Sequence, residues 1–407
     1  MHRANWFSWG SKSVALAIMC LLAVGAYNAQ KDGQKDGQIE GKISPNQWRL
    51  ADPIRYENLT LFPVLSRQSA DTAGFATLDE GLSAGQVVVT EGGAEMIRRS
   101  RDGHPVAIPG QSGASVNQLV LINRGSKPLL LLAGEMVSGG KQDRIISKDR
   151  VVPPGAAPLP LDVFCVEAGR WTGGAQFSAG NLMVHPSVRE QAAITKQQDK
   201  VWQAVRNGTT TEVPLNGAMA AAGPTPPEGG GVGAGRVGQT SQSVTVTSEA
   251  LSTVIVTEAP TQSYEKIYKS SKVAVPVDSF AEEVQRRFDR ATGKLKGEFV
   301  VGVVVAYGGE VAWGDIFASP ALFGRYWPKL LRSYVVEALT RPKSSEQPTI
   351  DDAREFLKPL VGHESVETEP AIYSLKEVTE GKYVEVELEA LRPFEITLHV
   401  MKVHRTS

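Results

Sequence analysis

The chain has 407 residues and a formal charge of -1, with 43 Lys and Arg against 44 Asp and Glu. Hydrophobic residues make up 42% of it, which is enough to bury sizeable cores and excludes a collagen-like or wholly disordered protein. The balanced charge gives no electrostatic reason to expect nucleic acid or an anionic membrane as the main partner. The length favours two or three domains.

An export signal is predicted over residues 1–29. Arg3 and Lys12 precede an apolar run, Val14–Ala26, which ends in small residues typical of a cleavage site. This run is shorter than the roughly 20 residues that span a bilayer as a helix, although an uncleaved N-terminal anchor remains an alternative. We therefore expect an exported protein, periplasmic or secreted, in which Cys165 is the one cysteine left after cleavage and no internal disulfide forms.

A polar, flexible tether is predicted over residues 30–54, because its composition cannot offset the entropy lost on ordering. Short apolar runs separated by turn residues then predict strands. These runs are Leu59–Leu65, Gln86–Thr90, Val116–Ile122, Leu129–Ala133 and Leu159–Val166. The turn residues Asn123–Pro128 predict that the third and fourth runs pair as an antiparallel hairpin.

A capping box at Ser187–Glu190 predicts a helix that continues to about Arg206. The glycine- and proline-rich residues 207–245 that follow predict a long flexible insertion. It interrupts an α+β domain that we place over residues 55–340. A C-terminal extension of a helix and a β-hairpin is expected over residues 341–407.

In the second half, four patterns predict further elements. A capping box at Ser279–Glu282 predicts one helix, and the apolar run Phe299–Tyr307 predicts a strand followed by a Gly308–Gly309 turn. Ser319–Pro320 predicts the start of a helix that runs to about Thr340, with a kink or break at Pro328. Thr349–Asp352 predicts the start of another helix, which runs to about Leu360. Strict alternation in the tail, where Glu395, Thr397 and His399 fall on the polar side, predicts strands that cover one face of a sheet. The expected fold class is α+β, with mixed or antiparallel sheets and several packed helices.

The polar loop Gly134–Arg144 is the most informative stretch. An apolar strand leads into it, and Glu135 at the end of this strand must be paired or functional, because a buried lone carboxylate is costly. One alternative is a structural ion pair with Lys141 or Arg144, and the other is a ligand or acid–base site. The candidate ligand-binding residues of the loop are Gly134, Gly139, Gly140, Lys141, Gln142, Asp143 and Arg144.

A second polar segment follows the strand that contains Cys165. Glu167 offers a carboxylate, Arg170 a guanidinium for carboxylate or phosphate, and Trp171 a face for stacking. Cys165 itself is expected to pack in the core as a small hydrophobic residue. The histidines lack the spacing of a zinc site and no phosphate-binding motif is complete, so no metal or cofactor is predicted.

These two segments, together with the stretch that contains Trp327–Lys329, resemble the family named for its association with ADP-ribosylglycohydrolases and rhodanese-phosphatase proteins. The resemblance covers roughly residues 55–340. It implies a setting of NAD and ADP-ribose metabolism but no defined activity and no catalytic residues.

The leading functional hypothesis is an exported domain that binds a small anionic, ADP-ribose-like or phosphate-bearing molecule. The Gly134–Arg144 loop would receive the anion together with Arg170 and Trp171. An alternative is a hydrolase of a glycosidic or phosphate bond with Glu135 or Glu167 as the general base. A third is an exported scaffold without a small-molecule site. Both site hypotheses require the two polar segments to converge. No nucleic-acid partner is predicted, and no membrane contact beyond the N-terminal signal or anchor.

Overall fold

The computed structural model describes residues 48–92, 117–166, 173–207, 271–341, 344 and 346–405. The predicted export signal lies outside these ranges, as do most of the predicted tether and all of the predicted insertion except Asn207. The described end of the tether, residues 48–54, is part of the fold, because Arg49–Leu50 forms strand β1 and Ile54 is buried. No helix in the described ranges is both long and apolar enough to cross a membrane.

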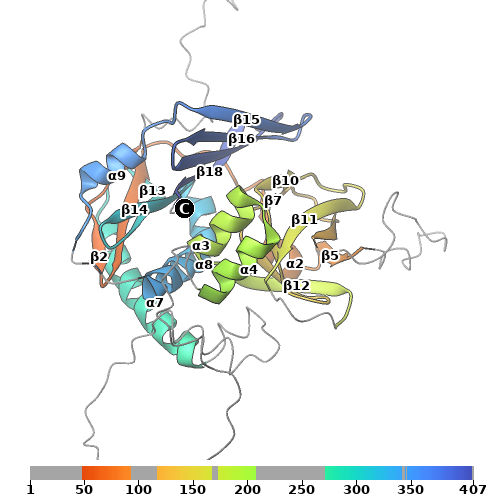
Figure 1. Ribbon diagram of the computed structural model, residues 1–407. Coiled ribbons are helices and arrows are strands. Elements are labelled where there is room, and N and C mark those ends of the chain that lie inside the picture. The colour runs from red at the N-terminus through yellow and green to blue at the C-terminus, as the bar shows by residue number, and fades with distance from the viewer. Residues whose placement is uncertain are drawn as a thin grey trace, which may run out of the picture. The chain divides into compact units, whose positions relative to one another are not determined.

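Strands from both ends of the chain form one antiparallel sheet, nine-stranded within the described residues (Figure 1). Its order is β1-β3-β13-β14-β18-β17-β16-β15, with β2 also paired to β3. The strands are β1 (Arg49–Leu50), β2 (Ile54–Tyr56), β3 (Leu59–Ser66), β13 (Phe299–Tyr307), β14 (Glu310–Phe317), β15 (His363–Glu369), β16 (Tyr373–Glu380), β17 (Tyr383–Ala390) and β18 (Ile396–His404). The tail is therefore continuous with the sheet that the first described residues begin.

The middle of the chain forms a closed barrel with the order β11-β6-β5-β12-β8-β9. Its strands are β5 (Val87–Glu91), β6 (Gln118–Asn123), β8 (Glu135–Gly139), β9 (Arg144–Ile146), β11 (Leu159–Cys165) and β12 (Gln176–Met183). A small sheet of β4 (Ala76–Thr77), β7 (Leu129–Leu131) and β10 (Arg150–Val152) accompanies it. The predicted hairpin of β6 with β7 is wrong: β6 pairs with β5 and β11, and β7 pairs with β4 and β10.

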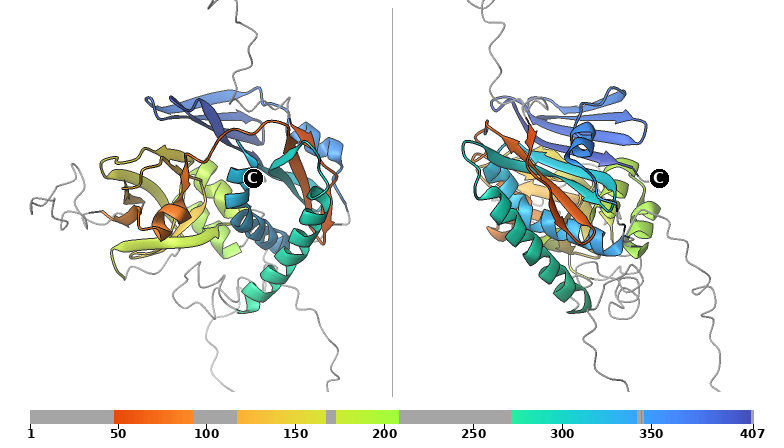
Figure 2. Two further views of the ribbon diagram at one scale, coloured as in Figure 1. Left: turned by 180° about the vertical axis from the view of Figure 1, so that it is seen from behind. Right: turned by 90° about the vertical axis from the view of Figure 1, so that its left-hand side faces the viewer.

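The described helices lie between and around these sheets, which confirms the α+β class (Figures 1 and 2). They are α2 (Leu78–Ser83), α3 (Pro186–Glu190), the π-helix η3 (Gln191–Thr195), α4 (Gln198–Asn207), α7 (Ser271–Thr292), α8 (Pro320–Thr340) and α9 (Ile350–Phe356). Helix α8 contacts β13 of the nine-stranded sheet and β12 of the barrel, so it joins the two.

Two of the four predicted helix starts are confirmed. Ser319 caps α8 and Thr349 forms a capping box with Asp352, because each side-chain oxygen accepts from a backbone amide of the first turn. Helix α8 continues through Pro328 without a break, and α9 ends at Phe356, before the expected Leu360.

The other two starts are wrong. Helix α7 begins at Ser271, so Ser279 lies inside it. Helix α3 begins at Pro186 after His185, and Ser187 donates its hydroxyl to Glu337 of α8 instead of capping its own helix. The predicted single helix is divided by η3 and by Lys196, which has a positive φ of 56°.

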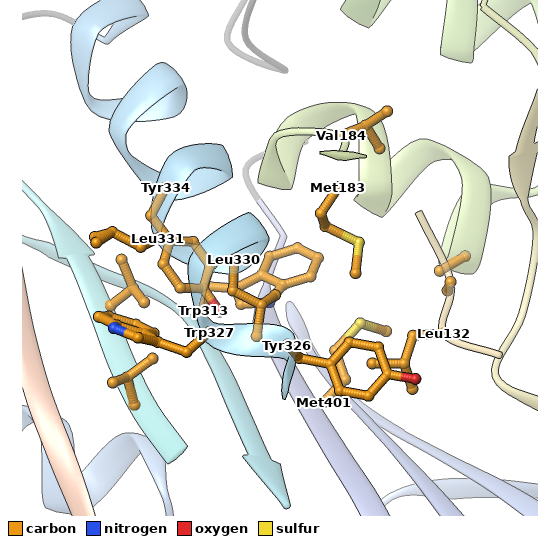
Figure 3. Packing of buried hydrophobic residues seen from close by; sticks show 14 of the residues in the cluster. Leu132, Met183, Val184, Trp313, Tyr326, Trp327, Leu330, Leu331, Tyr334 and Met401 are labelled. Carbon is orange, nitrogen blue, oxygen red and sulfur yellow. The ribbon is translucent and has the colours of Figure 1, made fainter. Parts of the chain in front are cut away.

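The largest core cluster gathers around α8. Figure 3 shows Tyr326, Trp327 and Tyr334 of this helix close to Trp313 of β14 and Met401 of β18. The contacts come from segments far apart in the sequence, so packing around α8 fixes how the barrel lies against the nine-stranded sheet.

Strand β18 departs from the pattern predicted for the tail. The alternation holds in β17, but Thr397 and His399, expected on the polar side, are buried in β18. β18 lies inside the sheet between β14 and β17, and its residues 396–403 are buried on both faces of the strand. Its polar residues consequently belong to the core.

Candidate functional site

Gly134 makes room for a buried arginine. Its φ is +87°, and a Cβ at this position would lie 2.7 Å from Cγ of Arg189. The backbone on either side is held in place, because Gly134 N donates to Ile146 O and its carbonyl accepts from Val184 N. Glycine is thus required here because the side chain of Arg189 packs against its Cα. This is a structural role for a residue that we predicted to bind ligand.

Glu135 is buried in an ion pair with a residue far away in the sequence. Its Oε1 lies 2.5 Å from Nζ of Lys329, and its Oε2 accepts from Leu132 N at 2.6 Å. The expected partners, Lys141 and Arg144, are wrong. Lys141 lies at the hairpin tip past the far end of β8, roughly 13 Å from Glu135 at about 3.3 Å per strand residue. Arg144 pairs with Val137, but its guanidinium contacts the carbonyl of Gln142 and the carboxylate of Glu91 instead.

Lys329 also contacts Asp79 of α2, at 2.6 Å, so one ammonium serves two carboxylates. Burial raises the pKa of Glu135, and the ammonium of Lys329 only partly opposes this effect. Burial alone would lower the pKa of Lys329, but Glu135 and Asp79 outweigh it and the pKa is raised. We call Asp79, Glu135 and Lys329 the outer cluster; Asp79 is its one partly exposed member.

The tip of the β8–β9 hairpin needs both of its glycines. A Cβ on Gly139 would lie 2.8 Å from Gln176 O, and one on Gly140 would lie 2.1 Å from Cζ of Phe177. Both have positive φ, of +123° and +53°. The tip is therefore pressed against the start of β12.

Carboxylates already accept from two amides of this hairpin. Glu91 Oε1 accepts from Lys141 N at 2.9 Å, and Asp143 Oδ1 accepts from Gly139 N at 3.0 Å. Arg144 is fully buried, with Nη2 at 4.0 Å from Glu91. These two amides and the Arg144 guanidinium stabilise the hairpin itself, whereas Lys141 is partly exposed at the tip.

Arg144 and Gln142 complete this arrangement, because Nη1 of Arg144 donates to the carbonyl of Gln142 at 2.9 Å. The side chains of Gln142 and Asp143 are buried with them. The sequence therefore located a dense polar hairpin correctly, but most of its polar groups point into the protein.

The strand pairing places the hairpin beside the end of the strand that precedes the second predicted segment. Arg144 of β9 pairs with Cys165 of β11, and Val166 N donates to Asp143 O at 3.4 Å. Glu91, at the end of β5, lies at the same end of the barrel, because it accepts from Lys141 N. The chain leaves β11 here toward Glu167, Arg170 and Trp171, which lie outside the described residues. We call this end of the barrel, with residues 139–144, Glu91 and Val166, the barrel mouth.

A second buried cluster was not predicted. Asp315 of β14 is fully buried and accepts from Arg189 Nη1 at 2.8 Å, from Trp313 Nε1 at 2.8 Å and from the hydroxyl of Tyr334. Its other oxygen lies 3.0 Å from Nε2 of His399. The arginine and the imidazole outweigh the effect of burial and hold the pKa of Asp315 well below its usual range.

His399 extends this cluster toward the small sheet. Its Nδ1 lies 2.5 Å from Asp149 Oδ2, and Asp149 Oδ1 accepts from Ala133 N at 2.7 Å. Because ionised carboxylates only accept hydrogen bonds, both ring nitrogens must donate, which requires the imidazolium. Burial alone would lower the pKa of His399, but the two carboxylates, Asp149 first, raise it.

We call Asp149, Arg189, Asp315 and His399 the central cluster. Its charges alternate along the chain of contacts, two negative and two positive, and all four side chains are buried. It joins α3, β14, β18 and the segment between β9 and β10. One sequence signal was present, because Asp315 interrupts an apolar run and a buried carboxylate needs a cation.

The match to known families includes both clusters. Residues 47–401 match the model of the ARG and Rhodanese-Phosphatase-superfamily-associated Protein domain, ARPP-1. The chain belongs to this family. The match confirms the resemblance seen in the sequence and continues beyond residue 340, where that resemblance ended, so the ARPP-1 domain includes the tail strands and His399.

No curated protein and no solved structure matches the chain. Among the residues that the structure describes, no group of three or more His, Cys, Asp or Glu side chains is arranged to hold a metal ion. The name of the ARPP-1 family records an association of the family with ADP-ribosylglycohydrolase and rhodanese-phosphatase proteins and gives no reaction.

Proposed function

We propose that the protein is an exported domain that binds a small anionic, ADP-ribose-like or phosphate-bearing molecule at the barrel mouth. Lys141 would contact the anion, while Arg170 would add a guanidinium and Trp171 a stacking face. The observation that carries the proposal is the pairing of Arg144 with Cys165, which joins the hairpin to the strand leading to Arg170.

The internal contacts of the hairpin divide its residues into two roles under this proposal. Gly139, Gly140, Asp143 and Arg144 would hold the hairpin in shape, because their groups are engaged within the protein. Lys141 would approach the ligand from the tip. The family name supports an ADP-ribose-like ligand only as an association of its members.

Binding is favoured over hydrolysis with Glu135 as the base. A general base must come within hydrogen-bond reach of a substrate proton. Glu135 is 1% exposed, and its oxygens are engaged by Lys329 and by Leu132 N. Glu167 remains the candidate of the hydrolase alternative.

Thermal unfolding in the presence of ADP-ribose, nucleotides, sugars and inorganic phosphate tests the proposal. A ligand at 100 times its dissociation constant should stabilise the protein by about 2.7 kcal/mol. Lys141→Ala and Arg170→Ala should abolish the shift, and the matched control Lys382→Ala, at an exposed turn, should retain it. Reading the mature N-terminus by mass spectrometry, in protein from the exported fraction, tests export.

Each outcome separates the alternatives. A shift that survives both variants would place the ligand elsewhere and contradict the site. Turnover of the ligand that is lost in Glu167→Gln would favour the hydrolase. No shift with any compound would favour the scaffold.

A further inference from the structure

A third polar cluster lies where α3 meets the end of α8 and the β13–β14 hairpin. Glu337 of α8 is fully buried and accepts from the backbone amide of Ser187 at 3.0 Å and from its hydroxyl at 2.6 Å. Arg341, one turn later, donates from Nε to the same carboxylate at 2.7 Å. Helix α3 is thus fastened to α8 by its first turn.

The charge of Arg341 is divided between two carboxylates. Its Nη1 lies 3.3 Å from Glu310 of β14, and Glu310 in turn contacts Nδ1 of His404 at 3.0 Å. The guanidinium also lies over the ring of Tyr307, 4.7 Å from its centroid. Arg341 is therefore already in direct contact with two carboxylates.

Glu190, the last residue of α3, is that third carboxylate. It is 3% exposed, and among the described residues its Oε1 has no hydrogen-bond partner and its carboxylate has no ion pair. The hydroxyl of Tyr307 in the same cluster is also buried without a partner there. Leaving such groups buried without a partner destabilises the fold, and more so when they are charged.

The charged groups around Glu190 come from several elements. Arg405 follows β18, Glu337 belongs to α8, Arg341 follows α8, and Glu310 belongs to β14. The imidazoles of His185, before α3, and His404, on β18, complete the cluster. Three carboxylates therefore share two guanidinium groups. Of the three, Glu190 is the one without a direct contact to either.

We propose that Glu190 is a proton-binding switch: α3 packs on α8 with this carboxyl protonated, and loss of the proton loosens that packing. Because Arg189 precedes it, a movement of α3 would reach Asp315 in the central cluster. The change from α to π geometry after Glu190 is a point where a helix can adjust.

Electrostatics support this assignment and set its pH range. Burial, more than any neighbour, raises the pKa of Glu190 to about 7; Arg405 and Arg341 oppose the rise, and Glu337 and Glu310 add to it. An acid whose folded pKa is raised stabilises the fold fully only while it is protonated. Stability should therefore fall as pH rises from about 4.5, the unfolded value, to about 7.

The test is urea unfolding of the full chain and of Glu190→Gln across this pH range. Gln mimics the protonated carboxyl, so the two proteins should match near pH 4.5. At pH 8 the folding equilibrium of the wild type should be weaker on the order of 100-fold. The control Glu364→Gln, on exposed strand β15, should follow the wild type at every pH.

A constant difference between wild type and Glu190→Gln at all pH values would overturn the switch. A second variant guards against an uninformative loss of folding in the first. Arg405→Met removes a cation that favours the charged form of Glu190, so the pH midpoint of the stability loss should move upward. An unmoved or lowered midpoint would contradict the assignment to Glu190.

Discussion

The outer and central clusters place charges in the core in different ways. In the outer cluster one ammonium, Lys329, serves Glu135 and Asp79, which leaves an excess of one negative charge. In the central cluster two cations and two carboxylates alternate. The effect of removing one member of a cluster on stability therefore depends on whether the charged group that remains can become neutral by gaining or losing a proton.

The guanidinium of Arg189 cannot neutralise itself, because arginine stays protonated in proteins. The carboxylate of Glu135 can, because it takes up a proton at moderate cost and its pKa is already raised. We therefore expect the central cluster to be more sensitive to substitution than the outer cluster.

The largest effect is expected from Asp315→Asn. It leaves Arg189 charged and buried without its counter-ion and removes an acceptor of His399. The free energy of unfolding, measured by urea denaturation, should fall by about 3–5 kcal/mol. Asp351→Asn, in an exposed ion pair with Arg354, is the control and should change little. A similar small loss in both variants would contradict the expected sensitivity of the central cluster.

Lys329→Met should cost less, about 2 kcal/mol, because Glu135 can protonate and Asp79 is partly exposed to water. Adding Glu135→Gln should recover part of this loss, since the stranded carboxylate is then gone. A double-mutant cycle by urea denaturation measures the coupling. A loss of stability in Lys329→Met as large as that in Asp315→Asn would contradict the expected difference between the two clusters. Strictly additive effects of Lys329→Met and Glu135→Gln would contradict it as well.

The smallest effect is expected from the titration of His399. A base whose folded pKa is raised stabilises the fold fully below its unfolded value, near 6.5, and loses this contribution as pH rises through the folded value. The stability difference between wild type and His399→Gln should therefore shrink as pH rises above 6.5. A difference that grows with pH would contradict the imidazolium.

Much of the fold could be predicted from local patterns. The helix starts at Ser319 and Thr349 depend on neighbouring residues alone, and so does the Gly308–Gly309 turn. The β6–β7 hairpin failed because a turn-like sequence does not decide which strands pair. The alternation in β18 misled for His399, because both faces of this strand are buried, and His399 meets Asp149 from a segment far away in the sequence.

The polar hairpin of residues 139–144 and the strand containing Cys165 could also be located from local patterns, because polar residues after apolar strands are visible in the sequence. The partner of Glu135 was missed, since Lys329 lies 194 positions away. His399 and Asp149 are 250 positions apart, and no spacing rule connects them.

The sequence was sufficient to predict the family, the α+β class and the position of the polar hairpin of residues 139–144. These follow from motifs and from periodicity, which are properties of neighbouring residues. Tertiary structure alone decided which carboxylate meets which cation, that the groups of Arg144 stabilise its own hairpin, and that Glu190 stays without an ion pair among the described residues. Charge pairing in a core is set by distances of a few ångströms between segments far apart in the chain, and only the packed fold brings those segments together.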